Sequence, residues 1–182
     1  MKKRSALSGF TLVEAMVAIS ILSLAVTGPL VIAQKGISSA IYARDQITAY
    51  YLAQEAVEYV RNARDTNRIQ GNPWLASLAA CKQGASGGEA CQIDARYTDF
   101  TSTGAVSACP GSGCPAISVD SSSGQYGYAS GGAWKQTAFT RTVSIDDRAS
   151  AKEAVISVTV SWRTNLFLPL RTFTIKEYVF DF

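Results

Sequence analysis

A continuous apolar run near the amino terminus constrains this chain more than any other feature. Phe10 to Ala33 spans 24 residues, of which only Glu14 is charged. A helix needs about 20 apolar residues to cross a bilayer, so this run is long enough to span one. Three basic residues, Lys2 to Arg4, precede it, and positive charge before a span keeps that end in the cytoplasm. The sequence therefore predicts one membrane helix followed by an exported head.

Two ordinary export signals explain only part of this segment. A cleaved signal peptide has an apolar run of about 7–15 residues, although Val31 and Ala33 could form its small-residue cleavage site. A plain signal anchor explains the length but gives no reason for Glu14, because a carboxylate is costly inside a bilayer. Glu14 could also snorkel to the nearby interface. A full explanation must cover both Glu14 and the abrupt start of the apolar run after Gly9.

The residues around Gly9 resemble the processing site of type IV prepilins. Gly9-Phe10-Thr11-Leu12-Val13-Glu14 matches their pattern of a short basic leader, a glycine, a phenylalanine and a glutamate four residues further on. The resemblance implies that a prepilin peptidase of the inner membrane cuts between Gly9 and Phe10 and then methylates the new amino group of Phe10. It also implies a pilin-like α+β fold, with a long amino-terminal helix packed on a carboxyl-terminal antiparallel sheet.

The same resemblance implies a role for Glu14 in assembly. Cleavage would leave a positive amine on Phe10, and burying an unpaired charge costs several kcal/mol. The implied partner of that amine is Glu14, in a pair formed with a neighbouring or incoming subunit.

Gly28 and Pro29 interrupt the apolar run. Proline removes a backbone hydrogen bond and clashes with the preceding turn, so the sequence predicts a kink or local unwinding at this point. The resemblance connects such a weak point with extension of the subunit in a filament. Pro29 is also compatible with an ordinary membrane helix, where proline is tolerated.

The chain after the apolar run is expected to continue the helix. We assign residues 1–9 to the leader, 10–34 to the membrane or filament-core helix, and 35–67 to an amphipathic continuation. Apolar residues at intervals of three and four predict one buried stripe, with charged residues on the other side. Arg61 and Asp65 are expected to form an i,i+4 ion pair. The stripe consists of Ala49, Leu52, Ala56, Val60 and Ala63, and the opposite side of Glu55, Glu58, Arg61 and Asp65.

Residues 68–136 are expected to form a variable loop region rich in Gly, Ser and Cys. Four cysteines on an exported chain favour disulfides over free thiols, and their spacing does not match a zinc site. Three pairings are possible, and the sequence does not choose among them, although adjacent pairing is favoured. The bridges would either stabilise loops or hold a surface for partner contact. The cysteines are Cys81, Cys91, Cys109 and Cys114, and a short helix is expected over Trp74–Cys81.

Residues 137–182 are expected to form an antiparallel sheet. Alternation of apolar and polar residues with Thr, Val and aromatics predicts strands with one covered face. Pro169 precedes the last strand, where a missing donor is harmless. Arg141 and Arg163 are interpreted as solvated or sheet-edge charges, and Asp146 and Asp147 as solvated turn acids. The expected strands are Thr137–Asp146, Ala154–Trp162 and Arg171–Asp181, with Gly124–Ser130 as a possible fourth at an edge.

Composition argues against a catalytic role. The chain has no histidine, which is the commonest general base and metal ligand. Motifs for phosphate binding, for a serine nucleophile or for paired metal ligands are not found, so no enzyme activity, cofactor or metal is expected. The net charge is +3, which Lys2, Lys3 and Arg4 alone supply, so the sequence carries no direct signal for nucleic-acid binding.

Two assembly functions remain open. One is a minor pilin of a type IV pilus that helps to initiate or decorate the filament, in adhesion, motility or DNA uptake. The other is a pseudopilin in the tip complex of a type II secretion system. Tyr51–Asn67 is similar to the equivalent stretch of V-type minor pilins and I-type pseudopilins. A membrane-anchored exported enzyme or binding protein is a less favoured third possibility.

The resemblance also implies where the protein resides and what it meets. The implied location is a single pass through the inner membrane with the head outside the cytoplasm, and then a cell-surface or periplasmic filament. The implied partners are the lipid bilayer before assembly, the prepilin peptidase, the inner-membrane assembly platform, and other pilins or pseudopilins.

Overall fold

The computed structural model describes residue 9 and residues 11–83, 90–111, 113–148, 152–164 and 169–181. The elements follow the chain as one long helix, a short 3-10 helix and a series of strands. They are α1 (Leu12–Ile69), η1 (Ala76–Cys81), β1 (Cys91–Ile93), β2 (Val106–Ala108), β3 (Ala116–Asp120), β4 (Tyr126–Gly127), β5 (Trp134–Arg148), β6 (Glu153–Trp162) and β7 (Arg171–Phe180). The chain divides into two compact units, Met1–Asp45 and Gln46–Phe182.

The first unit contains the apolar part of α1. Every residue from Thr11 to Arg44 is exposed. Three hydroxyls in this segment donate to backbone carbonyls of the preceding turn: Ser20 to Met16, Ser23 to Ile19 and Thr27 to Ser23, at 2.8, 2.8 and 2.9 Å. These bonds satisfy the hydroxyl donors within the helix itself, which makes the segment compatible with lipid.

The weak point expected at Gly28 and Pro29 is helical in the structure. Pro29 lies inside α1, and the helix is continuous on both sides of it. The helix is therefore not unwound at this point, and the alternative of a kink at Gly28 and Pro29 stays a prediction. Neighbouring hydrogen bonds hold a helix across the one bond that a proline removes, as membrane helices commonly do.

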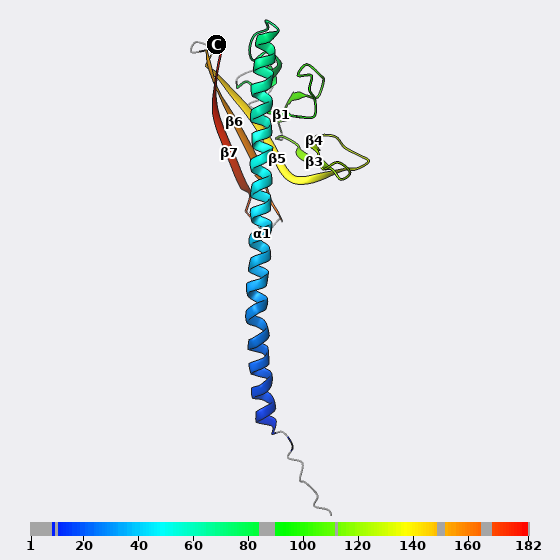
Figure 1. Cartoon of the computed structure of the whole chain (residues 1–182), viewed down its shortest axis with the longest axis vertical. Helices are drawn as coiled ribbons and strands as arrows, with labels where there is room; N and C mark the ends of the chain where they lie inside the picture. The colour runs from blue at the N-terminus through cyan, green and yellow to red at the C-terminus, as the bar shows by residue number, and fades with distance from the viewer. Residues whose placement is uncertain are drawn as a thin grey trace, which may run out of the picture. The chain divides into compact units, whose positions relative to one another are not determined.

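The second unit is built on one antiparallel sheet with β5 at its centre. β6 pairs with β5 from Phe139↔Trp162 to Arg148↔Glu153 and with β7 along its whole length. On the other side of β5, β3 pairs with its first half and β1 meets it at Val143. The order β2-β1-β5-β3-β4 places β4 at an edge, which confirms the edge strand expected within Gly124–Ser130. Figure 1 labels the long strands beside the helix.

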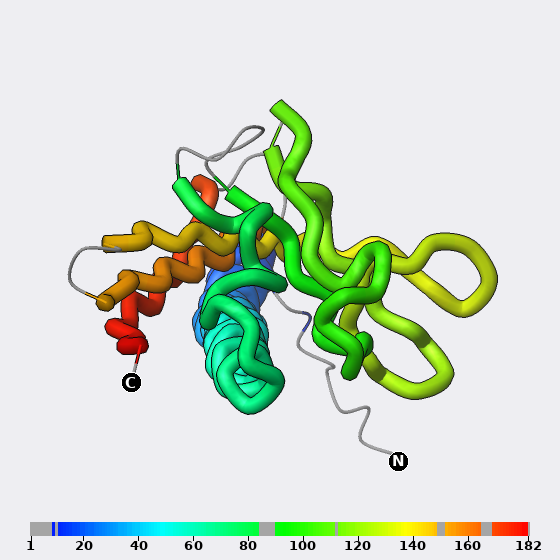
Figure 2. The backbone as a smooth tube through the Cα atoms, turned by 90° about the horizontal axis from the view of Figure 1, so that it is seen from above, coloured from blue at the N-terminus to red at the C-terminus, as the bar shows by residue number. Residues whose placement is uncertain are grey.

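The core lies between the sheet and residues 46–69 of α1, and in Figure 2 the helix is seen nearly end-on against β5, β6 and β7. All five residues of the expected stripe are buried, with exposed fractions of 0–3%. The sheet supplies alternating residues, including Val143, Ile145, Ile156, Val158 and Val160, each with an exposed fraction of 0%. The long helix packed on a carboxyl-terminal antiparallel sheet confirms the predicted α+β fold.

Several local expectations differ from the structure. β5 begins at Trp134, three residues before the expected start, and β1, β2 and β3 lie where loops were expected. Strands of three to five residues contain too few alternating positions to reveal a period of two. The expected helix at Trp74–Cys81 is the shorter 3-10 helix η1.

The expected Arg61–Asp65 ion pair is wrong. Arg61 binds Glu58 at 2.7 Å and Glu177 of β7 at 2.5 Å, whereas Asp65 pairs with Arg64. Helical spacing allowed the predicted pair, but the fold brings the Glu177 carboxylate to the same guanidinium.

The interpretation of Asp146 and Asp147 as turn acids is also wrong. Both residues lie within β5, and Asp147 pairs with Lys82 at 2.7 Å. The sequence pattern placed the end of the strand two residues too early, because consecutive acids are more typical of turns. Arg163, by contrast, is exposed as expected.

Candidate functional site: the amino-terminal segment and the head

The amino-terminal segment is organised by a helix cap at Thr11. α1 begins at Leu12, and the Thr11 Oγ1 accepts a hydrogen bond of 3.2 Å from the backbone N–H of Glu14. The Thr11 carbonyl accepts the first helical bond, 3.1 Å from the Ala15 N–H. Thr11 is thus the N-cap and Glu14 the third helical residue, in the T-x-x-E order of a capping box.

This geometry gives Glu14 a local role within one chain. A negative side chain in the first turn is favoured by the positive end of the helix dipole, and the Glu14 side chain is exposed. The sequence interpretation concentrated on the pairing of charges between subunits and missed the cap, although the T-x-x-E signal was present. Phe10, the expected methylation position, lies outside the described residues, as do residues 1–8 of the expected leader, while Gly9 precedes the helix.

Comparison with known families singles out this same segment. Residues 4–28 match the model of the prokaryotic N-terminal methylation motif. The match supports a type IV prepilin-like family. A prepilin-type motif implies processing by prepilin peptidase and assembly with other pilins, and it suggests a structural subunit. The comparison with curated proteins found no match, and neither did the comparison with solved structures.

The helix that begins within the motif is apolar and long enough for a membrane anchor. Among the described residues, α1 is the helix that is long and apolar enough to cross a membrane, by length and composition. Its most apolar window has no buried residues. Together with the methylation motif, this exposed apolar helix fits a membrane-anchored pilin.

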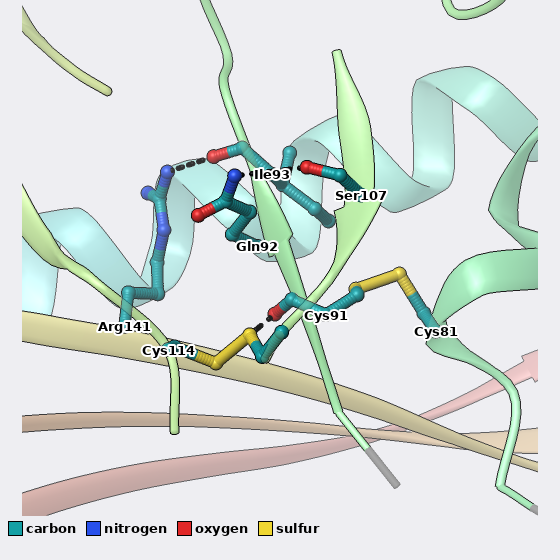
Figure 3. The surroundings of a disulfide bond; sticks show 8 residues. Cys81, Cys91, Gln92, Ile93, Ser107, Cys114 and Arg141 are labelled. Atoms are coloured by element: carbon teal, nitrogen blue, oxygen red, sulfur yellow. Dashed lines mark hydrogen bonds between the residues drawn. A yellow bond between two sulfur atoms is a disulfide. The ribbon is translucent and has the colours of Figure 1, made fainter. Parts of the chain in front are cut away.

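In the head, which is the second unit (Gln46–Phe182), a buried arginine of the sheet fastens the sheet to α1. This corrects the interpretation of Arg141 as a solvated charge. Arg141 is only 1% exposed. Its Nη1 donates to the Leu52 carbonyl at 2.8 Å and to Glu55 Oε2 at 2.6 Å, and its Nη2 donates to the Ile93 carbonyl at 2.6 Å. One side chain of β5 therefore holds both α1 and β1. Figure 3 shows its bond to the Ile93 carbonyl of β1.

Arg141 can be buried because its charge is matched. A buried ion without partners costs several kcal/mol, and a carboxylate with carbonyl acceptors offsets that cost. Position 141 follows the alternation of β5, so its side chain points to the covered face with Val143 and Ile145. The strand period in the sequence could have revealed this orientation, but nothing in the sequence identified Glu55 as the partner.

The cysteines form two bridges in the head. Cys81 is bonded to Cys91 and Cys109 to Cys114, which is the adjacent arrangement that the sequence favoured. The first bridge joins η1 to β1, two residues from the carbonyl that Arg141 binds (Figure 3). The Cys114 sulfur lies 3.8 Å from the Cys91 carbonyl oxygen, so the second bridge contacts the first. β1 is thus held by covalent, sheet and side-chain contacts despite its length of three residues.

A second polar cluster connects the chain after β1 with the β3–β4 hairpin. Asp94 receives two bonds from the Arg96 guanidinium, at 2.8 and 2.6 Å, and one of 3.0 Å from the Tyr128 backbone N–H. Burial by itself raises the pKa of the Asp94 carboxyl, but these bonds outweigh burial and lower the pKa. The Arg96 guanidinium also lies over the Trp134 ring at 4.5 Å. A side chain at Gly127 would overlap Arg96, so the cluster requires glycine there.

Tyr59 faces this cluster from α1. Burial, followed by the charges of Asp94 and Asp99, raises the pKa of the Tyr59 hydroxyl to about 12. Its ring packs edge-on against Phe100 with centroids 5.0 Å apart. The Tyr59 hydroxyl is therefore neutral at any physiological pH. Tyr59 contacts Phe100 through packing of the two rings.

The outer surface of the head carries two exposed tyrosines of α1, Tyr50 and Tyr51, near the half-buried Tyr126 and Phe173. Two open hollows share Tyr51: one is lined also by Tyr50 and Phe173, the other also by Glu55 and Tyr126. Tyr51 is 64% exposed. These hollows are shallow surface features. Within the described parts of the chain, no group of three His, Cys, Asp or Glu side chains could hold a metal ion.

Proposed function

We propose that this protein is a minor pilin-like structural subunit of a type IV pilus. The observation that carries the proposal is the methylation motif at residues 4–28, which includes the start of the exposed apolar part of α1. The same helix continues into a disulfide-bonded head, where its buried stripe meets the sheet. The function is then mechanical: α1 anchors and assembles the subunit, and the head presents a surface.

Processing prepares α1 for assembly. The peptidase hydrolyses the Gly9–Phe10 amide: water supplies a hydroxyl to the Gly9 carbonyl carbon and a hydrogen to the Phe10 nitrogen. The new amine then takes a methyl group from a sulfonium methyl donor and loses a proton to solvent. At neutral pH the methylated amine is cationic, so Glu14 of a neighbouring or incoming subunit offers it a counter-charge in an apolar filament core. Gly28 and Pro29 are the place where the helix would extend as the subunit enters the filament.

The processing step is tested by the intact mass of the membrane form. We expect the loss of residues 1–9 and the addition of one methyl group on Phe10. A mature chain that starts near Gln34 would show removal by an ordinary signal peptidase and would overturn the proposal.

The assembly step is tested by Glu14→Val. This variant retains the backbone donor to Thr11, so cleavage should continue, while incorporation into filaments should fall at least tenfold. Glu58→Val, which changes an exposed carboxylate of the head, is the matched control and should be incorporated normally. Normal incorporation of Glu14→Val would refute the charge-pairing role.

A pull-down of filaments through a carboxyl-terminal tag tests which machine the subunit serves. Co-purification with pilus subunits is expected for the minor pilin. Recovery with secretion pseudopilins alone would instead assign the subunit to a type II secretion tip complex, the alternative that the same amino-terminal motif allows. Before assembly we place the protein in the inner membrane, with the head outside the cytoplasm and the assembly platform as its partner.

A further inference from the structure

The two disulfides of the head differ in their access to solvent. Cys81 and Cys91, which form the first bridge, are each 0% exposed. In the second bridge Cys109 is 9% exposed and Cys114 is half-buried. Exchange between a thiol and a disulfide requires that a thiolate reach one of the two bonded sulfur atoms. A thiol in solution can therefore approach the second bridge through Cys114, whereas the first bridge becomes accessible only when the head opens.

The backbone contacts around the second bridge do not depend on its sulfur–sulfur bond. The Cys109 N–H donates to the Ala90 carbonyl at 3.0 Å. β1 is held by the first bridge, by its pairing with β2 and by Arg141. The Cys114 sulfur lies 3.8 Å from the Cys91 carbonyl oxygen (Figure 3), so a thiol at this position would have an acceptor for its weak S–H donor. The sheet is therefore expected to keep its pairing when the second bridge opens.

We propose that the Cys109–Cys114 bridge is a reversible site of thiol–disulfide exchange that takes a dithiol from solution, while the Cys81–Cys91 bridge stays closed in the folded head. Exchange switches the chain between β2 and β3 from a closed loop to an open one, and β1 keeps its place in both forms. The inference concerns the head alone and goes beyond the proposed function, which depends on the amino-terminal motif.

The exchange transfers two electrons from the dithiol to the bridge. One thiol of the reagent loses a proton, and its thiolate attacks Cys114 Sγ; the bond to Cys109 Sγ breaks, and its electron pair leaves with Cys109 as a thiolate. The second thiol of the reagent, also deprotonated, attacks the reagent sulfur of the mixed disulfide and releases Cys114. The two cysteine sulfurs take up the two protons, and the reagent is left as a cyclic disulfide.

The experiment treats the folded full-length chain in detergent with dithiothreitol and then blocks free thiols with iodoacetamide. Mass spectrometry of the intact chain and of its peptides counts and locates the blocked cysteines. We expect Cys109 and Cys114 to be blocked at least about tenfold faster than Cys81 and Cys91, which react only through opening of the head. Denaturant should remove the difference. Oxidised glutathione, added after removal of dithiothreitol, should close the second bridge again.

The matched control is the Cys109→Ser and Cys114→Ser double variant. It should show no fast blocking in the folded state, and in denaturant only Cys81 and Cys91 should be blocked. The tryptophan fluorescence of the wild type should keep its folded spectrum during reduction of the second bridge, because β1 stays in place. Glutathione, a monothiol, tests the point of attack: after quenching with acid, the mixed disulfide is expected on Cys114.

The outcomes decide the inference without reference to the proposed function. Blocking of all the cysteines at the same rate, or of none before denaturant is added, would overturn it. Loss of the folded fluorescence spectrum as soon as the second bridge opens would also overturn it, since the sheet would then depend on that bridge. A mixed disulfide on Cys109 in place of Cys114 would overturn the assigned point of attack. The proposed function fails instead on the mass of the processed membrane form.

Discussion

α1 has two parts, and the apolar side chains of the two parts have different surroundings. From Leu12 to Arg44 the side chains are exposed all around, and polar hydroxyls are bonded back to the helix. From Ala49 to Ala63 one stripe is buried against a sheet and the other side is charged or polar. The first part needs an apolar environment from outside the chain, whether lipid or other subunits. The second part is covered by the sheet of the head. Anchor and head should therefore respond separately to mutation.

A large loss of stability of the head is expected on replacement of Arg141. Arg141→Ala leaves Glu55 and two carbonyls without their donor, and breaking a buried ion pair costs about 3–5 kcal/mol. Because Glu55 is partly exposed, the lower end of this range is expected. Chemical unfolding of the full chain in detergent measures the free energy, through the fluorescence of Trp74, Trp134 and Trp162, all of which lie in the head.

The control for Arg141 is Arg163→Ala, which removes an exposed arginine and should change the free energy of unfolding by less than about 0.5 kcal/mol. Equal effects of the two replacements would show that Arg141 does not fasten the helix to the sheet. Membrane insertion of both variants should be unchanged, because the anchor does not depend on this contact.

A matched pair of leucines tests the comparison within the helix itself. Leu52 is 3% exposed and Leu22 is 65% exposed. Leu52→Ala should lower the unfolding free energy of the head by about 2–5 kcal/mol, because it leaves a cavity in the core. Leu22→Ala should leave that energy unchanged and should affect membrane retention or filament incorporation instead. A head equally sensitive to both would contradict the division into separate units.

The two disulfides are expected to differ in their contribution to the head. Cys81–Cys91 closes the longer loop, a separation of 10 residues against 5 for Cys109–Cys114, and it fixes the strand that Arg141 binds. A Cys81→Ser and Cys91→Ser double variant should lose about 2–3 kcal/mol. The corresponding Cys109→Ser and Cys114→Ser variant should lose less. The same unfolding experiment gives both values, and the reverse order would contradict the central position of β1.

The smallest effect is expected from the pH dependence of Asp94. Its pKa is lowered in the folded head, so the charged carboxyl contributes stability at pH values above the ordinary pKa of aspartate. That contribution is lost as the pH falls through the lowered pKa. Asp94→Asn should therefore destabilise the head at pH 7 by about 1 kcal/mol, with the difference from the wild type shrinking in acid. A difference independent of pH would show that the charge of Asp94 does not stabilise the cluster.

Sequence patterns predicted the features that depend only on the order of residues along one segment. The apolar run predicted a helix long enough to cross a membrane, and the spacing of Ala49 to Ala63 predicted the buried stripe. The glycine, phenylalanine and glutamate of the motif indicated the prepilin-like family that the match at residues 4–28 supports. Long alternating strands such as β6 were recognisable for the same reason, since a period of two is visible over ten residues. The cap at Thr11 was equally local, and the T-x-x-E order could have predicted it.

Only the tertiary structure decided which distant groups meet. Glu55 and Ile93 reach Arg141 from elements 86 and 48 residues away, and Arg61 takes Glu177 from β7 in place of the nearby Asp65. The sequence by itself determined an apolar helix long enough to cross a membrane, a methylation motif and a helix with one face to bury, because these depend on the order of residues along a single segment. The identity of each charge partner depends instead on the register of strands and the position of the helix over them, which arise only when the whole head packs.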